Sequence, residues 1–111
     1  IGHTGDLNAT KKAIKFVDKC VNKIAKCSLG ANGDLIVTAD HGNAEVMIDD
    51  FGNKVTSHTT NKVPIILVSE KYKNCKLKDG ILADVAPTIL KLLNIKQPKE
   101  MTGQNLLVEQ L

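Results

Sequence analysis

The sequence predicts an α/β layer structure with a mainly parallel central sheet. Two observations carry this prediction: short apolar runs that are typical of buried strands, and flanking segments whose apolar residues recur at helical spacing. In chain order we expect a helix, a buried strand, a strand pair, a second buried strand and a second helix, a pattern typical of layered α/β proteins. The 111 residues are enough for one small domain or for part of a larger one.

The first predicted helix runs from Asn8 to Ser28. Gly30 is the expected stop, and Asp6 or Asn8 can supply the N-cap. The lysines on one face are spaced at i,i+4 and repel one another mildly. We therefore expect tertiary packing of the opposite, apolar face to hold this helix in place. That face consists of Ile14, Val17, Val21 and Ile24.

Two short apolar runs are typical of strands that are buried on both faces. The first spans residues 35–37 and follows a turn at Asn32 and Gly33. The second spans residues 63–68, with Pro64 near its start, where a missing N–H is tolerated. Between them, residues 45–48 and 54–57 predict a strand pair linked by a turn at residues 49–53.

The rest of the chain predicts a polar loop at residues 71–80 and a second helix at residues 82–93. Asp84 stands near the start of that helix, and Pro87 is tolerated in its first turns. A final apolar patch consists of Leu106, Leu107 and Val108.

Charge and composition argue against some partners. The formal net charge is +3, and the cations are all lysines, with no arginine. Arginine is the usual bidentate grip on phosphate, so a clamp for a phosphorylated acid would have to lie outside this sequence. The lysines are spread out, and one Tyr and two Phe offer little for base stacking, which argues against nucleic acid. No apolar run approaches the roughly 18 residues of a membrane span, so we expect no membrane partner.

Cysteine usage predicts a reducing, cytoplasmic environment. Cys20, Cys27 and Cys75 form no CxxC pair and leave an odd thiol, which fits neither a disulfide framework nor a zinc site. We expect Cys20 and Cys27 to border the buried face of the first helix. The sequence has no initiator methionine and no secretory signal, and a motif is already under way at Ile1. We therefore expect the chain to be a piece of a larger protein.

The candidate chemistry lies at His3, His41 and His58, which we expect to flank helices and strands rather than lie inside them. Asp40 and His41 follow the apolar run 35–37, and ligands of open α/β sheets bind beyond the carboxyl ends of the strands. Imidazole and carboxylate are the usual ligands of Mn or Zn ions that act on phosphates. Taken singly, Asp40 is also compatible with an Asx turn, and each histidine with a surface position. Their joint occurrence indicates a metal site.

Five motifs resemble those of the cofactor-independent phosphoglycerate mutases, which belong to the alkaline-phosphatase-like superfamily. They occur in the family's order and cover nearly the whole chain: GHTG at 2–5, TADHGNAE at 38–45, HTTNKVP at 58–64, LADVAPT at 82–88 and EMTG at 100–103. Asp-His-Gly alone is shared across the superfamily. Its combination with the HTTNKVP motif is specific.

The resemblance implies that residues 1–111 are the C-terminal segment of an alkaline-phosphatase-like three-layer domain, and hence an incomplete domain. It implies a glycolytic isomerase that interconverts 3-phosphoglycerate and 2-phosphoglycerate through a phosphoserine, with two divalent cations and no bisphosphoglycerate. Manganese is the expected metal, with Mg, Co or Zn as alternatives. Asp40 and His41 are the implied ligands of the metal that holds the nucleophilic serine, and His3 and His58 those of the second metal.

The resemblance also implies what this sequence lacks. The family's aspartate four residues before the first histidine would precede Ile1, and the nucleophilic serine, another metal-binding aspartate and the arginines lie upstream as well. We therefore expect no catalytic residue in the chain, and no activity from the chain alone.

Two other readings remain open. The chain could act as a non-catalytic metal-binding or scaffold fragment, or the parent could be another phosphoryl-transfer enzyme of the superfamily, against which HTTN at 58–61 argues. We expect phosphoglycerate as the parent's partner, a monomeric parent and a fragment that can self-associate.

Overall fold

The structure, a computed structural model, describes residues 1–109; Gln110 and Leu111 lie outside the described part. It combines helices and strands, as the predicted α/β class requires. The elements in chain order are η1 (Gly2–Thr4), α1 (Leu7–Gly30), β1 (Leu35–Thr38), β2 (Ile65–Val68), β3 (Cys75–Leu77), η2 (Leu82–Asp84), α2 (Val85–Leu92) and β4 (Leu107–Glu109).

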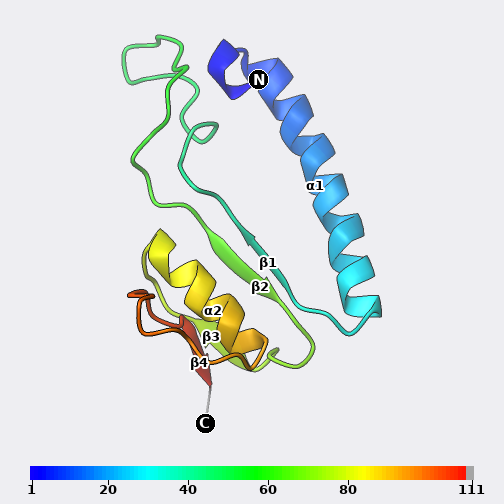
Figure 1. Cartoon of the computed structure of the whole chain (residues 1–111). Helices are drawn as coiled ribbons and strands as arrows, with labels where there is room; N and C mark the ends of the chain where they lie inside the picture. Colours follow the sequence, from blue (N-terminus) through cyan, green and yellow to red (C-terminus); the bar gives the residue numbers. More distant parts are fainter. Residues whose placement is uncertain (110–111) are drawn as a thin grey trace.

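The β1–β2 ribbon lies between two groups of elements (Figure 1). The long helix α1 runs along one side and contacts β1, whereas β3, β4 and α2 lie on the other side, where β3 contacts β2. The molecule is therefore layered, with helical structure on both sides of a strand pair.

The strand pairs of the described residues are antiparallel, which corrects the predicted mainly parallel sheet. β1 pairs with β2, with Leu35 opposite Val68 and Thr38 opposite Ile65. β3 likewise pairs antiparallel with β4. Parallel neighbours need a crossover connection, usually a helix, whereas residues 39–64 contain no helix and return the chain beside the strand that it left. The end of β1 and the start of β2 therefore lie at the same end of the ribbon.

Other local predictions differ in detail. The strand pair expected at 45–48 and 54–57 is reduced to a single bridge between Ile48 and Lys54. The Asp49 carboxylate closes the connecting turn, because it accepts hydrogen bonds from the backbone N–H groups of Phe51 and Asn53. β3 lies inside the segment that was expected to be a polar loop, and β4 begins in the apolar patch near the C-terminus.

The helix α1 has the predicted ends but not the predicted packing. The Asp6 side chain caps it by accepting from the Ala9 N–H at 2.9 Å, and Gly30 is its last residue. The apolar side chains Ile14, Val17 and Ile24 are 52%, 57% and 55% exposed. Both central strands are likewise half-buried or partly exposed rather than buried on both faces. The apolar surface that should hold α1 in place is thus largely uncovered in this chain.

The cysteine prediction is correct for the thiol state and only partly for burial. Cys20, Cys27 and Cys75 are all free thiols. Cys20 is half-buried, whereas Cys27 is exposed. Among residues 1–109, no helix combines the length and the apolar character needed to cross a bilayer.

A tightly bonded core lies near the C-terminus, around α2. Thr88 is fully buried; its hydroxyl donates to the Asp84 carbonyl at 2.7 Å and accepts from the Leu106 N–H at 3.0 Å. The Asp84 carboxylate accepts from the N–H groups of Ile81 and Gln104, at 2.8 and 2.7 Å. These bonds tie the start of the second helix, whose first turn is the 3-10 turn η2, to the segment that leads into β4.

The chain exposes more surface than a compact protein of its mass. Its solvent-accessible area is 8432 Å², whereas a compact 12.0 kDa monomer exposes about 6,000 Å². Its radius of gyration is 16.8 Å, against about 13 Å for a compact domain of this length. Of the described apolar residues, Met47, Pro87, Leu106 and Leu107 are the buried ones. Most of the apolar surface is therefore available to a partner.

Candidate metal centre

The antiparallel return of the chain brings the three histidines together. His41 follows β1 and His58 precedes β2, so both lie at the same end of the ribbon. His3 lies in the 3-10 turn η1, which corrects the expectation that no histidine lies in a helical element. The start of α1 lies beside the loops that join β1 to β2 (Figure 1), so this turn reaches the same place.

The imidazole rings form a compact cluster, as the sequence predicts. The rings of His41 and His58 are stacked, with centroids 3.6 Å apart and planes inclined by 17°. The His3 ring lies 5.0 Å from the His58 ring. Asp40 Oδ1 lies 3.6 Å from His41 Nε2. The convergence of these side chains is observed, whereas their assignment as metal ligands stays a prediction.

Backbone carbonyls orient two of the rings. His3 Nδ1 lies 2.7 Å from the Thr56 carbonyl oxygen, and His41 Nδ1 lies 3.0 Å from the Gly42 carbonyl oxygen. A carbonyl oxygen can only accept a hydrogen bond, so Nδ1 carries the proton and donates in both rings. In the neutral tautomer this leaves the Nε2 lone pair free, which is how metal-binding histidines are commonly held.

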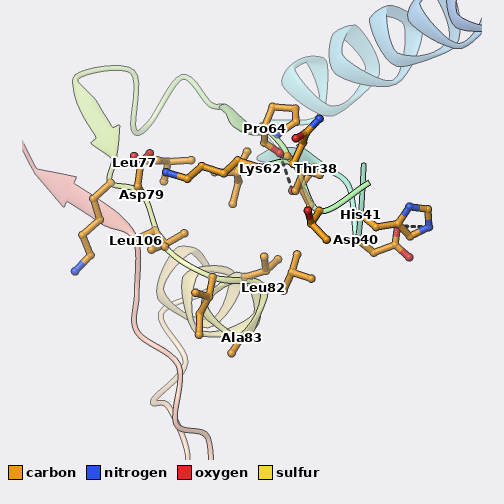
Figure 2. A pocket seen from close by; sticks show the side chains of 18 of the residues that line it. Thr38, Asp40, His41, Lys62, Pro64, Leu77, Asp79, Leu82, Ala83 and Leu106 are labelled. Atoms are coloured by element: carbon orange, nitrogen blue, oxygen red, sulfur yellow. Dashed lines mark hydrogen bonds and ion pairs between the residues drawn. The ribbon is translucent and has the colours of Figure 1, made fainter. Parts of the chain in front are cut away.

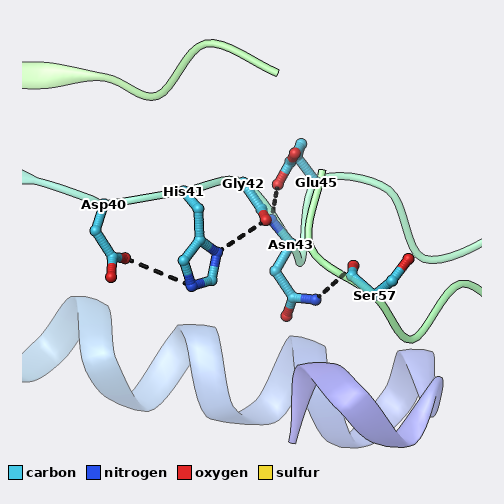
Figure 3. Close-up of polar contacts among 6 residues, drawn as sticks. All are labelled: Asp40, His41, Gly42, Asn43, Glu45 and Ser57. Atoms are coloured by element: carbon cyan, nitrogen blue, oxygen red, sulfur yellow. Dashed lines mark hydrogen bonds and ion pairs between the residues drawn. The ribbon is translucent and has the colours of Figure 1, made fainter. Parts of the chain in front are cut away.

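The pair formed by Asp40 and His41 favours a cation (Figure 3). With Nδ1 protonated, the Nε2 lone pair of neutral His41 faces a carboxylate oxygen at 3.6 Å. Two acceptors in this position repel each other unless a proton or a metal cation lies nearby. The donor types therefore fit a divalent metal.

The ligand set is nevertheless partial. Over residues 1–109, no group of three or more His, Cys, Asp or Glu side chains is arranged so that it could hold a metal ion. The cluster thus fits the expected metals as a contributor of ligands, not as a complete coordination shell.

Sequence reasoning missed Glu45, which joins the loops that carry His41 and His58. Its carboxylate accepts from the Asn43 N–H at 2.7 Å, from the Thr59 hydroxyl and from the Asn61 amide at 3.2 Å. These bonds, led by that of Thr59, lower the pKa of Glu45 to about 2, so the carboxylate is ionised at neutral pH. The available signal was its place at the end of the TADHGNAE motif, but the residue was assigned to a strand.

Backbone contacts bring the same two loops close. Gly42 and Thr59 form an antiparallel bridge, in which the Thr59 N–H donates to the Gly42 carbonyl at 2.8 Å. The Asn43 amide also donates to the Ser57 carbonyl at 3.1 Å (Figure 3). A Cβ atom at Gly42 would collide with the Thr59 hydroxyl and the Glu45 carboxylate, so the contact requires glycine.

A cavity of about 850 Å³ opens beside the cluster (Figure 2). Asp40 and His41 lie on one side of it, and Leu82, Ala83 and Leu106 line another part. Lys62 and Lys78 also contribute to its wall. The cavity is therefore lined by two of the predicted ligands, by apolar side chains and by two cationic side chains.

Comparison with known protein families identifies the superfamily of this chain. The family described as the metalloenzyme superfamily matches residues 1–97. The chain belongs to this superfamily.

The matched relatives are phosphoglycerate mutases, as the resemblance predicts. A 2,3-bisphosphoglycerate-independent phosphoglycerate mutase of Ehrlichia ruminantium (strain Gardel) is 56% identical over 108 residues, which are 96% of this chain and 21% of the relative. The corresponding protein of Moorella thermoacetica is 48% identical over 109 residues, 98% of this chain and 21% of the relative. The chain therefore spans about a fifth of the length of the curated relatives it matches.

A solved structure has the same fold over nearly the whole chain. The phosphoglycerate mutase of Leishmania mexicana, solved at low cobalt concentration, superposes with a TM-score of 0.84 at 31% identity. The match covers 98% of this chain and 23% of that protein. The layered α/β fold is thus that of part of a phosphoglycerate mutase.

Proposed function

We propose that this chain is the metal-ligand segment of a 2,3-bisphosphoglycerate-independent phosphoglycerate mutase, which interconverts 3-phosphoglycerate and 2-phosphoglycerate. The observation that carries the proposal is the cluster of His3, His41 and His58 at one end of the ribbon. Its support is the 56% identity to a relative of that name.

Each side chain has a role in this proposal. Asp40 and His41 hold the metal that also binds the nucleophilic serine, and His3 and His58 contribute to the second metal site. A bound divalent cation lowers the pKa of the serine hydroxyl and stabilises charge on the attacking and leaving oxygens. The carbonyls of Thr56 and Gly42 keep the Nε2 atoms of His3 and His41 available, because they hold the Nδ1 protons. Manganese is the first candidate, with Mg, Co and Zn as alternatives.

The rest of the parent supplies the nucleophile and the substrate grip. This chain has no arginine to orient a phosphorylated acid, and it offers two ligands to each proposed metal. Retention of the phosphoryl group on an enzyme serine makes a bisphosphoglycerate cofactor unnecessary. We infer that residues 1–111 form an incomplete domain and are inactive alone. The surface in excess of a compact protein supports this inference.

The second candidate is a non-catalytic metal-binding or scaffold fragment. The observation that favours a non-catalytic role for the chain by itself is that it has no arginine to hold a phosphorylated acid. The glycolytic role, the cytoplasmic location and the monomeric parent belong to the first candidate alone. Self-association of the fragment is expected in both, because the apolar side of α1 is exposed.

The test is a chimaera in which residues 1–111 replace the matching segment of the Ehrlichia ruminantium relative. We expect the chimaera to convert 3-phosphoglycerate to 2-phosphoglycerate in the presence of Mn²⁺, as the unmodified relative should do. The chain alone should show no conversion. A folded chimaera without activity, beside an active relative, would contradict the mutase assignment. Activity of the chain alone would contradict the division of roles between the segments.

A further inference from the structure

The loops that carry His41 and His58 have little packing to hold them in place. Met47 is the buried apolar residue between β1 and β2 among those described. The separation of the two rings must therefore depend on polar links between the loops.

We propose that Glu45 is a positioning residue whose carboxylate clamps the His58 loop to the His41 loop and so maintains the ring stack. The inference rests on the proposed function only in its consequence for metal binding. The clamp itself is defined by contacts within this chain.

Both oxygens of the carboxylate take part in the clamp. Oε2 accepts from the Asn43 N–H, two residues after His41. Oε1 accepts from the Thr59 hydroxyl, one residue after His58, and from the Asn61 amide. One side chain thus bonds to both loops, next to the histidine of each.

The clamp needs a carboxylate rather than an amide. All three partners of Glu45 act as donors, and an ionised carboxylate offers acceptors on both oxygens. Glutamine at this position keeps the size but replaces one acceptor with an NH₂ donor. That donor would face either the Asn43 N–H or the pair formed by Thr59 and Asn61. Glu45→Gln should therefore break one side of the clamp without creating a cavity.

Loss of the clamp should loosen the loops without unfolding them. The Thr59 N–H still donates to the Gly42 carbonyl, and the Asn43 amide still donates to the Ser57 carbonyl. The core around Thr88 lies in other elements and does not contact Glu45 through any of these bonds.

The first experiment uses the metal-free chain and nuclear Overhauser effects between histidine rings. In the wild type, the effect between His41 and His58 should exceed that between His3 and His58, because the rings are 3.6 and 5.0 Å apart. In Glu45→Gln, we expect the His41–His58 effect to fall to the level of the His3–His58 effect or below it. The matched control is Glu70→Gln, since Glu70 is exposed and pairs only with Lys73 among the ion pairs of residues 1–109.

A second pair of variants tests the clamp from the other loop. Thr59→Val removes the hydroxyl and should weaken the His41–His58 effect, whereas Thr59→Ser keeps the hydroxyl and should restore it. The proposal would be overturned if the His41–His58 Overhauser effect in Glu45→Gln, or in a folded Thr59→Val, were as strong as in the wild type. Equal losses in Thr59→Val and Thr59→Ser would overturn it as well.

The second experiment measures the consequence for metal binding in the chimaera. By calorimetry with Mn²⁺ alone, Glu45→Gln should weaken affinity by about 10-fold, the lower end of the range for partners bonded directly to a ligand, because Glu45 bonds to residues beside the proposed ligands. Unchanged affinity would overturn the positioning role. If the parent chimaera binds no Mn²⁺, the proposed function fails, while the ring-contact experiment still decides the clamp.

Discussion

The two ends of this chain are stabilised in different ways. Around α2, buried Asp84, Thr88 and Leu106 share hydrogen bonds, so this C-terminal region carries its own small core. Around α1, apolar side chains such as Val17 and Ile24 are more than half exposed. The histidine loops, which lie between β1 and β2 in the sequence, are beside the start of this helix (Figure 1). The proposed chemistry therefore lies in the part of the chain with more exposed apolar surface, and the hydrogen-bonded core lies in the other part.

The largest expected effect is a loss of activity without a loss of stability. In the chimaera, His41→Ala or Asp40→Ala should reduce activity to background, because each removes a proposed ligand of the serine-binding metal. The melting temperature of metal-free protein should change little, since His41 lies outside the buried core. Cys20→Ala is the control and should retain activity. Turnover of the His41→Ala enzyme within a few-fold of the parent would contradict the ligand assignment.

The next effect tests the self-contained core. Thr88→Val should lower the free energy of unfolding by about 1–3 kcal/mol, because the Leu106 N–H loses its acceptor in a buried site. Thr88→Ser keeps the hydroxyl and should lie closer to the wild type. Urea unfolding of the chain measures both. Equal stability of the Val and Ser variants would show that packing, not this bond, holds the core.

A third substitution sharpens the contrast by acting at the open end. Val17→Ser should change the stability of the isolated chain by no more than about 0.5 kcal/mol, because the side chain is already 57% exposed. In the chimaera, the same substitution should lower the melting temperature, since we propose that the rest of the parent covers this face. Lys19→Ser is a control on the same helix. Equal effects in chain and chimaera would contradict the proposal that α1 packs against other segments of the parent.

The smallest expected effect is on the stability of the protein at acidic pH. Hydrogen bonds from the N–H groups of Gln104 and Ile81, in that order, lower the pKa of Asp84 below its ordinary value of 3.8. A lowered folded-state pKa stabilises the protein above the ordinary pKa, and this contribution disappears as the pH falls through the lowered value. The melting temperature should therefore decline below about pH 4. Asp84→Asn should flatten that decline. An unchanged acid limb in Asp84→Asn would exclude this carboxylate as its cause.

Sequence patterns predicted the positions of helices and strands better than they predicted which segments these elements pair or pack with. Asp6 was one of two predicted caps of α1, and the Gly30 end and the apolar run that became β1 were also predicted, because these signals are local. β3 and β4 were missed because each spans only three residues and gains its strand geometry from the other. The expected burial of α1 was not found, because hydrophobic periodicity says which face seeks a partner and not whether this chain contains it.

The sequence by itself identified the family and predicted that four side chains would converge, as they do. Both predictions rested on Asp40 and His41 after a strand and on the motifs around His3 and His58. Only the tertiary structure decided that β1 and β2 run antiparallel, and hence that His41 stacks on His58. It alone assigned Glu45 to the link between the two loops. The physical reason is that periodicity and caps depend on neighbouring residues, whereas the path of a loop without periodicity depends on contacts between distant ones.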